Sequence, residues 1–96
     1  MSNWSVQFSE AAAKQLENLL DFLEKEWSAD DRARFLEKLD STAEILKAYP
    51  MSFPHSLIEP GVRKCVVSKL TTIFYLVGKD RISIVAISDV RLPDKG

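Results

Sequence analysis

The chain has 96 residues, of which 46% are hydrophobic and 28% charged, with one cysteine. This composition is typical of a single soluble domain and excludes a disordered chain, and no apolar run approaches the ~20 residues that cross a bilayer. The first ten residues lack the basic and apolar regions of a secretory signal. A lone cysteine excludes an internal disulfide and suits a reducing compartment. We therefore expect one cytoplasmic domain over residues 1–96, with no membrane partner.

The net charge of −1 hides an asymmetry between the two halves of the chain. Residues 1–49 carry six Lys or Arg against ten Asp or Glu, a balance of −4, whereas residues 50–96 carry seven against four, a balance of +3. The overall balance argues against a protein that coats nucleic acid by charge alone. Any anionic partner is expected to contact the second half.

The first half of the chain predicts a strand and two helices. Residues 3–8 alternate between apolar and polar side chains, which is the pattern of a half-buried strand. Residues 10–27 place apolar side chains three and four residues apart, and Ser9 precedes them as a helix cap. A second helix is predicted over 29–49, where Pro50 ends it. Because only a few residues separate the two helices, they should form an antiparallel hairpin.

The segment 50–61 holds three prolines and a glycine and predicts an irregular connection. Four apolar side chains in it are expected to pack the connection onto the core: Met51, Phe53, Leu57 and Ile58. His55 is the only histidine of the chain, and neither a nearby cysteine nor clustered carboxylates accompany it. No metal site is therefore expected.

The second half predicts three more strands, over 62–69, 71–77 and 81–89. A Gly-Lys-Asp turn at residues 78–80 lies between two apolar runs, which is a hairpin signal. The last two strands are apolar on both faces, whereas two helices are enough to cover only one face of a sheet. The predicted fold is α+β in the order β-α-α-β-β-β, with a helix hairpin on one face of a small, mainly antiparallel sheet. The other face is a candidate docking surface.

Chemistry in this chain is limited to a few residue types. The sequence has no glycine-rich phosphate loop, no Cys/His metal spacing and no histidine-based triad, so no cofactor is expected. Acid–base work would fall to tyrosine, lysine, arginine or carboxylates, and arginine and lysine also stabilise charge on phosphate. The candidate site residues are polar side chains in or beside the predicted strands: Arg63, Lys64, Lys69, Tyr75, Arg81, Asp89 and Arg91.

Each candidate also has a structural interpretation. Arg63 and Arg81 lie near strand starts, where charged side chains blunt sheet edges and stay solvated. Tyr75 lies in an apolar run and is expected in the core with its hydroxyl at a boundary. Asp89 and Arg91 are two residues apart on one strand face, so they are expected to pair with each other.

Three segments of the chain, together with the order of its elements, carry a family resemblance. The segments are VQFSEAAAKQLENLLDFL, ARFLEKLDSTAEILKAYP, and GVRKCVVSKLTTIFYLV followed by ISIVAISDVRLP. The chain resembles the RelE/ParE superfamily of bacterial type II toxins over nearly its whole length. The ending Asp89-Val90-Arg91-Leu92-Pro93 is similar to an Asp-x-Arg-x-x-Pro-like ending of one subgroup, and is one residue shorter before the proline.

The resemblance implies a toxin that a neighbouring antitoxin holds inactive, with the antitoxin's C-terminal segment wrapped around the sheet and helices. ParE-like members inhibit DNA gyrase, and RelE-like members cleave mRNA in the ribosomal A site without a metal. Arg63 matches the arginine at the start of the second strand, and Arg81 lies near a basic residue leading the last strand. Both would be catalytic in a RelE-like protein. The remaining candidates would bind the target or the antitoxin: Lys64, Lys69, Tyr75, Asp89 and Arg91.

Two departures from the RelE-like pattern guide the choice between these activities. The cleaving branch has its catalytic tyrosine beyond the last strand, whereas this chain has none after Tyr75, and Ser88 stands where many members have histidine. We therefore favour a ParE-like toxin that binds DNA gyrase. The alternatives are a RelE-like ribosome-dependent mRNA endonuclease and a non-toxic member that only binds antitoxin. The open sheet face would seat the antitoxin or, in a homodimer, a second copy.

Overall fold

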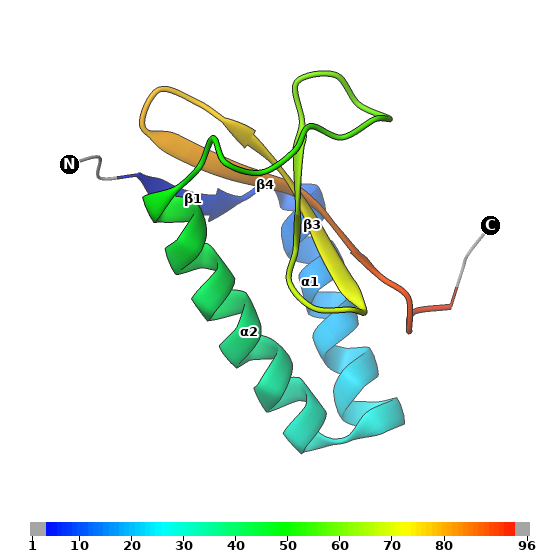
Figure 1. The fold of residues 1–96 in the computed structure, drawn as a ribbon. Helices are drawn as coiled ribbons and strands as arrows, with labels where there is room; N and C mark the ends of the chain where they lie inside the picture. Colours follow the sequence, from blue (N-terminus) through cyan, green and yellow to red (C-terminus); the bar gives the residue numbers. More distant parts are fainter. Residues whose placement is uncertain (1–3, 94–96) are drawn as a thin grey trace.

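The computed structural model describes residues 4–93, in which two helices lie against one side of a four-stranded sheet (Figure 1). The elements are β1 (Ser5–Phe8), α1 (Glu10–Phe22), the π-helical turn η1 (Leu23–Trp27), α2 (Ala29–Ala48), β2 (Arg63–Val66), β3 (Thr71–Val77) and β4 (Arg81–Asp89). The predicted α+β class, with a helix hairpin on one face of the sheet, is confirmed. In the part of the chain that the structure describes, no helix is long and apolar enough to span a membrane.

Serine side chains cap both helices. Ser9 Oγ accepts a hydrogen bond from Ala12 N at 3.1 Å, and Ser28 Oγ accepts one from Asp31 N at 3.0 Å. Each bond satisfies a first-turn amide that has no partner inside its own helix. The helix predicted over 10–27 is therefore capped as expected, although its last five residues form η1.

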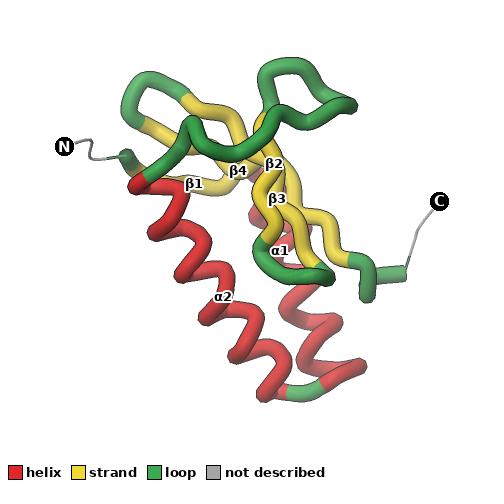
Figure 2. Tube along the Cα trace, viewed as in Figure 1, coloured by secondary structure: helices red, strands yellow, loops and turns green. Residues whose placement is uncertain are grey.

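The sheet has the strand order β1-β4-β3-β2 (Figure 2). β1 is parallel to β4, and the β4–β3 and β3–β2 pairs are antiparallel. The register shifts in β4, where Phe74 pairs with Ala86 but Tyr75 pairs with Ile84. The bulge at Val85 keeps Ile84 and Ile87 on the same buried face although they are three residues apart.

The core lies between the helices and the face of the sheet that they cover, which we call the inner face. Its largest fully buried apolar side chains come from both layers: Leu19, Leu23, Leu46, Ile73, Tyr75, Ile82 and Ile84. Burying one aliphatic side chain contributes about 1.5–3 kcal/mol, so this layer is the main source of stability. The alternate strand residues form the opposite, open face: Lys64, Val66, Thr72, Phe74, Leu76, Ser83, Ala86 and Ser88.

The strand predicted over 62–69 is shorter than expected, because β2 spans only Arg63–Val66. Val67 N and Ser68 N both donate to Thr71 O, at 2.9 and 3.2 Å, and close a tight turn into β3. Residues 67–70 contain no glycine, proline, asparagine or aspartate, and Ser68 alone favours a turn, so the sequence gives only a weak turn signal there. The strands predicted over 71–77 and 81–89 have the bounds of β3 and β4.

Candidate functional site

Arg63 holds the connection between α2 and β2, which we call the α2–β2 loop (residues 49–62). Its side chain is half-buried, and it lies on the inner face opposite Tyr75. The guanidinium donates to Met51 O at 3.2 Å and to Phe53 O at 2.7 Å. The guanidinium that was predicted to act in catalysis is therefore hydrogen-bonded to two backbone carbonyls. In this conformation Arg63 has a structural role.

Tyr75 holds the same loop from the core. It is 0% exposed, and its hydroxyl donates to Pro50 O at 2.9 Å. Its ring packs edge-to-face against Phe53, with 6.4 Å between the ring centroids. Burial raises the pKa of Tyr75 to about 12. The interpretation of Tyr75 as a core residue is confirmed, although its hydroxyl is buried rather than at a boundary. Its assignment to a binding surface stays a prediction, and in this conformation no part of the side chain is accessible.

The two predicted catalytic arginines lie on opposite faces of the sheet. Arg63 shares the inner face with Tyr75, its partner in β3, and Tyr75 pairs in turn with Ile84 of β4. Arg81 precedes the buried Ile82 along β4 and therefore points to the open face, where it is exposed. Arg63 lies two strand spacings from Ile84, and Arg81 lies three residues before Ile84 along β4, so the Cα atoms of the two arginines are about 14 Å apart. The structure therefore does not bring Arg63 and Arg81 together.

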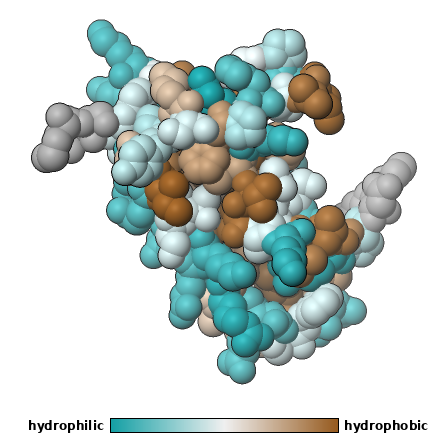
Figure 3. Space-filling view, viewed as in Figure 1, coloured by the Kyte–Doolittle hydropathy of each residue, from teal (hydrophilic) through white to brown (hydrophobic). Residues whose placement is uncertain are grey.

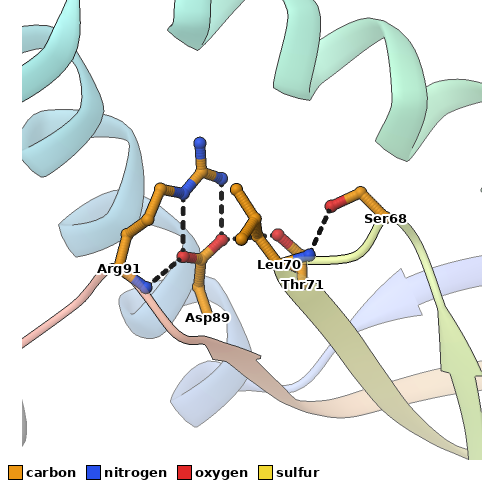
Figure 4. A network of polar contacts seen from close by, with 5 residues as sticks. All are labelled: Ser68, Leu70, Thr71, Asp89 and Arg91. Atoms are coloured by element: carbon orange, nitrogen blue, oxygen red, sulfur yellow. Dashed lines mark hydrogen bonds and ion pairs between the residues drawn. The ribbon is translucent and has the colours of Figure 1, made fainter.

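A buried ion pair closes the C-terminal end of β4 (Figure 4). Asp89 accepts hydrogen bonds from Arg91 Nε at 3.0 Å, from a terminal nitrogen of that guanidinium at 2.8 Å, and from the Thr71 hydroxyl. Burial of Asp89 acts to raise its pKa, but the hydrogen bonds from Arg91 and Thr71 outweigh burial and hold that pKa below its ordinary value. The Arg91 guanidinium also lies 5.5 Å from the ring centroid of Trp27 in η1.

This network confirms the predicted pairing of Asp89 with Arg91 and buries the Asp89 carboxylate, whose assignment to a binding surface stays a prediction. The Asp89 side chain is 0% exposed and the Arg91 side chain only 11% exposed. In this conformation that carboxylate has no atom accessible to a partner. Because Arg91 stacks on Trp27, the network instead joins the end of the sheet to the end of the first helix.

A cleft opens beside this network, between the first turns of α2 and the turn from β2 to β3. Its volume is about 390 Å³. Its lining is Asp31, Arg34, Phe35, Lys38, Ser68, Lys69, Leu70 and Arg91, and we call it the basic cleft. The structure thus brings the predicted Lys69 and Arg91 together with two cations that sequence reasoning missed, Arg34 and Lys38. The signal for these two was their spacing of four residues, which places both on one flank of a helix.

An apolar surface occupies the other side of the sheet. Val66 and Leu76 are exposed on the open face, next to the exposed Lys64. The α2–β2 loop projects beside this face, and its apex carries Leu57 and Ile58, which are 97% and 87% exposed. Figure 3 shows hydrophobic side chains on the surface in view, including some at the apex of the projecting loop.

The loop apex corrects an expectation from the sequence. Leu57 and Ile58 do not pack on the core, and Met51 is also exposed, so only Phe53 of the four apolar loop residues does what was predicted. The apex is nevertheless well hydrogen-bonded. Ser56 Oγ accepts bonds from Ile58 N and from the next amide, at 3.2 and 3.4 Å, and Ser56 N donates to the Val62 carbonyl.

Comparison with known proteins identifies the family of this fold. Residues 6–91 match the family model described as ParE toxin of type II toxin-antitoxin system, parDE. The chain belongs to the ParE toxin family. This membership confirms the resemblance to the RelE/ParE superfamily and identifies the chain as a toxin of a toxin–antitoxin system. No curated protein sequence gives a significant match.

Solved structures share the fold of this ParE-family chain at low sequence identity. The structure described as the chromosomal ParDE TA system from P. aeruginosa is 17% identical, with a TM-score of 0.75 over 92% of this chain and 97% of that one. A YoeB/ParE toxin from Agrobacterium tumefaciens is 14% identical, with a TM-score of 0.65 over 88% and 96%. The E. coli DinJ-YafQ toxin-antitoxin complex is 12% identical, with a TM-score of 0.61 over 91% and 92%. At these identities the likeness extends to the fold alone.

Proposed function

We propose that this ParE-family toxin inhibits growth by binding DNA gyrase and that a cognate antitoxin neutralises it. The observation that carries the choice of binding over cleavage is the position of Arg63 and Arg81 on opposite faces of the sheet. The family match supports the toxin class, and the similar structures from P. aeruginosa and E. coli are a ParDE TA system and a DinJ-YafQ toxin-antitoxin complex.

Metal-free cleavage of RNA needs an acid, a base and cationic groups that converge on one phosphate. Arg63 donates to loop carbonyls, and Arg81 lies about 14 Å away on the other face by strand spacing. The Tyr75 phenol is buried, and its pKa of about 12 makes it a poor base near neutral pH. These three positions support a protein that acts by contact rather than by catalysis.

The open face and the loop apex are the surfaces that we assign to the target. Leu57 and Ile58 are large aliphatic side chains at the end of a loop that Arg63 and Tyr75 hold at its base. Exposed apolar surface that is held in place is typical of protein-binding sites, where a few such anchors supply most of the affinity. Lys64 borders this surface and would pair with an acidic group of the target.

The test compares two purified systems under the same conditions. The toxin is added to DNA gyrase with relaxed plasmid, and separately to programmed ribosomes carrying mRNA, and supercoiling and mRNA cleavage are measured. We expect inhibited supercoiling and intact mRNA. Cleaved mRNA with unaffected gyrase would establish the RelE-like alternative, and no effect in either system, together with harmless expression, would leave only antitoxin binding. Sedimentation of the toxin alone measures whether a second copy binds, which a homodimer through the open face requires.

A further inference from the structure

The basic cleft has two walls that come from separate parts of the chain. One wall is the first part of α2, and the other is the turn that carries Lys69 and Leu70. That turn is anchored because Leu70 N donates to Ser68 Oγ at 3.1 Å and Leu70 O accepts from Val90 N at 2.9 Å. The Thr71 hydroxyl fixes the next residue to Asp89. An anchored turn of this kind binds a partner at a lower ordering cost than a mobile one.

Among the residues that the structure describes, two of the four cations in the cleft form ion pairs, and two do not. Arg34 pairs with Asp31 at 2.9 Å, and Arg91 pairs with the buried Asp89. Lys38 and Lys69 are exposed, and within residues 4–93 neither forms an ion pair. Two unpaired cations therefore face one cleft in a chain whose net charge is −1. This local excess favours an anionic occupant.

The apolar part of the cleft lining distinguishes between anionic partners. Leu70 is 37% exposed and offers an aliphatic surface beside Phe35, which is only 5% exposed. A nucleic acid strand gains affinity by stacking bases on exposed aromatic rings, and this cleft presents none. A peptide with carboxylates on either side of an aliphatic residue matches the exposed surface of Leu70 and the two lysines, Lys38 and Lys69.

We propose that the basic cleft binds an acidic segment of the antitoxin, with an aliphatic side chain packed on Leu70 and carboxylates paired with Lys38 and Lys69. The identity of the partner rests on the function proposed above, whereas the chemistry of the segment rests on the cleft. The cleft lies on the helix side of the sheet, away from the open face assigned to the target. Contact here would anchor the antitoxin without competing directly for the target surface.

The experiment measures the affinity of the toxin for the protein encoded by the adjacent reading frame. The variants are Lys38→Gln with Lys69→Gln, and Lys38→Glu with Lys69→Glu. The control Lys14→Glu with Lys79→Glu makes the same change in net charge as the Glu double variant, at exposed lysines outside the cleft. Thermal unfolding checks that all variants fold.

We expect affinity to fall at least ten-fold in the Glu double variant, less in the Gln variant, and little in the control. Leu70→Ser should weaken binding with no change in its salt dependence, whereas the Gln variant should flatten that dependence. Equal affinities of the cleft and control variants would overturn the proposed cleft. If the cleft variants bound the antitoxin normally but lost affinity for a single-stranded oligonucleotide, the cleft would be a nucleic acid site and the proposal would be overturned. If the wild-type toxin fails to bind the adjacent frame's product, the proposed function fails instead.

Discussion

Arg63 and Tyr75 lie opposite each other across β2 and β3, and both donate hydrogen bonds to the same stretch of the α2–β2 loop. Tyr75 binds the Pro50 carbonyl, and Arg63 binds those of Met51 and Phe53. Two side chains with the chemistry of an active site thus fix the base of a loop. Their effect on function is indirect, because by fixing the base of the loop they orient its apex.

Arg63→Ala should destabilise the fold, whereas Arg81→Ala should not. Removing a charged donor from two carbonyls is expected to lower the free energy of unfolding by about 1.5–3 kcal/mol. Arg81 is exposed at the start of β4, so its replacement should change that free energy by less than about 0.5 kcal/mol. Urea unfolding followed by tryptophan fluorescence measures both. Similar small effects for the two arginines would contradict the structural role of Arg63.

Tyr75→Phe should make the stability of the protein less sensitive to alkaline pH. At neutral pH the lost hydrogen bond to Pro50 O should cost about 1 kcal/mol. Burial raises the pKa of Tyr75 from 10 to about 12, so between these values the folded state keeps a proton that the unfolded state has lost. Wild-type stability must then fall as pH rises from 10 towards 12.

The matched control for that change is Tyr49→Phe, since Tyr49 is exposed. Urea unfolding at pH 9 and at pH 11 gives, for each protein, the change in the free energy of unfolding between the two pH values. These values lie on either side of the ordinary pKa of tyrosine, about 10. We expect the Tyr49 variant to follow the wild type and the Tyr75 variant to lose less stability at the higher pH. A Tyr75 variant that lost as much as the wild type would show that other groups cause the alkaline decline.

Asp89→Asn should be more harmful than Thr71→Val. The first change leaves the poorly exposed Arg91 without its carboxylate, which for a buried pair costs about 3–5 kcal/mol. The second removes one hydrogen bond from the same carboxylate and should cost about 1 kcal/mol. Thermal or urea unfolding at neutral pH ranks the two, with the exposed Asp40→Asn as control. A reversed order would mean that Thr71, not Arg91, is the main partner of Asp89.

The same ion pair predicts an acid dependence. The pKa of Asp89 lies below its ordinary value of 3.8, so the stabilisation is fully present above that value and is lost as pH falls through the lower folded value. Wild-type stability should therefore decline below about pH 4 more steeply than that of Asp89→Asn. Parallel declines in an acid titration of unfolding would assign the effect to other carboxylates.

Local patterns in the sequence were sufficient for the elements and for part of the site. Serine caps and three- to four-residue apolar steps specify α1 and α2, and its position in an apolar run predicts that Tyr75 lies in the core. The pairing of Asp89 with Arg91 followed from a two-residue spacing. Each of these features depends on neighbours within one element, which a single sequence displays directly.

Features that depend on pairing between elements were not visible in the sequence. The face of Arg81 relative to Arg63 depends on the register of three strands and on the bulge at Val85. The basic cleft joins α2 to a turn about thirty residues later, so no pattern within one element links Lys38 to Lys69. Leu57 is exposed although large aliphatic side chains are usually buried. Hydrophobic composition alone does not say which residues of a loop contact the core.

The last prediction concerns the loop apex, where stability and function should separate. Leu57→Ser with Ile58→Ser replaces side chains that are 97% and 87% exposed, so the free energy of unfolding should change by less than about 0.5 kcal/mol. Growth inhibition on expression without antitoxin should nevertheless be lost, because the apolar anchors of the proposed target surface are removed. The control Ile45→Ser changes an exposed aliphatic side chain of α2 and should leave growth inhibition intact.

Phe53→Ser provides the opposite case in the same loop. Phe53 packs against Tyr75, so its loss should destabilise the protein, and growth inhibition should fall only in proportion to the folded fraction. Growth curves and thermal unfolding on all three variants separate a contact effect from a folding effect. Full growth inhibition by the folded apex variant would exclude Leu57 and Ile58 from the target surface.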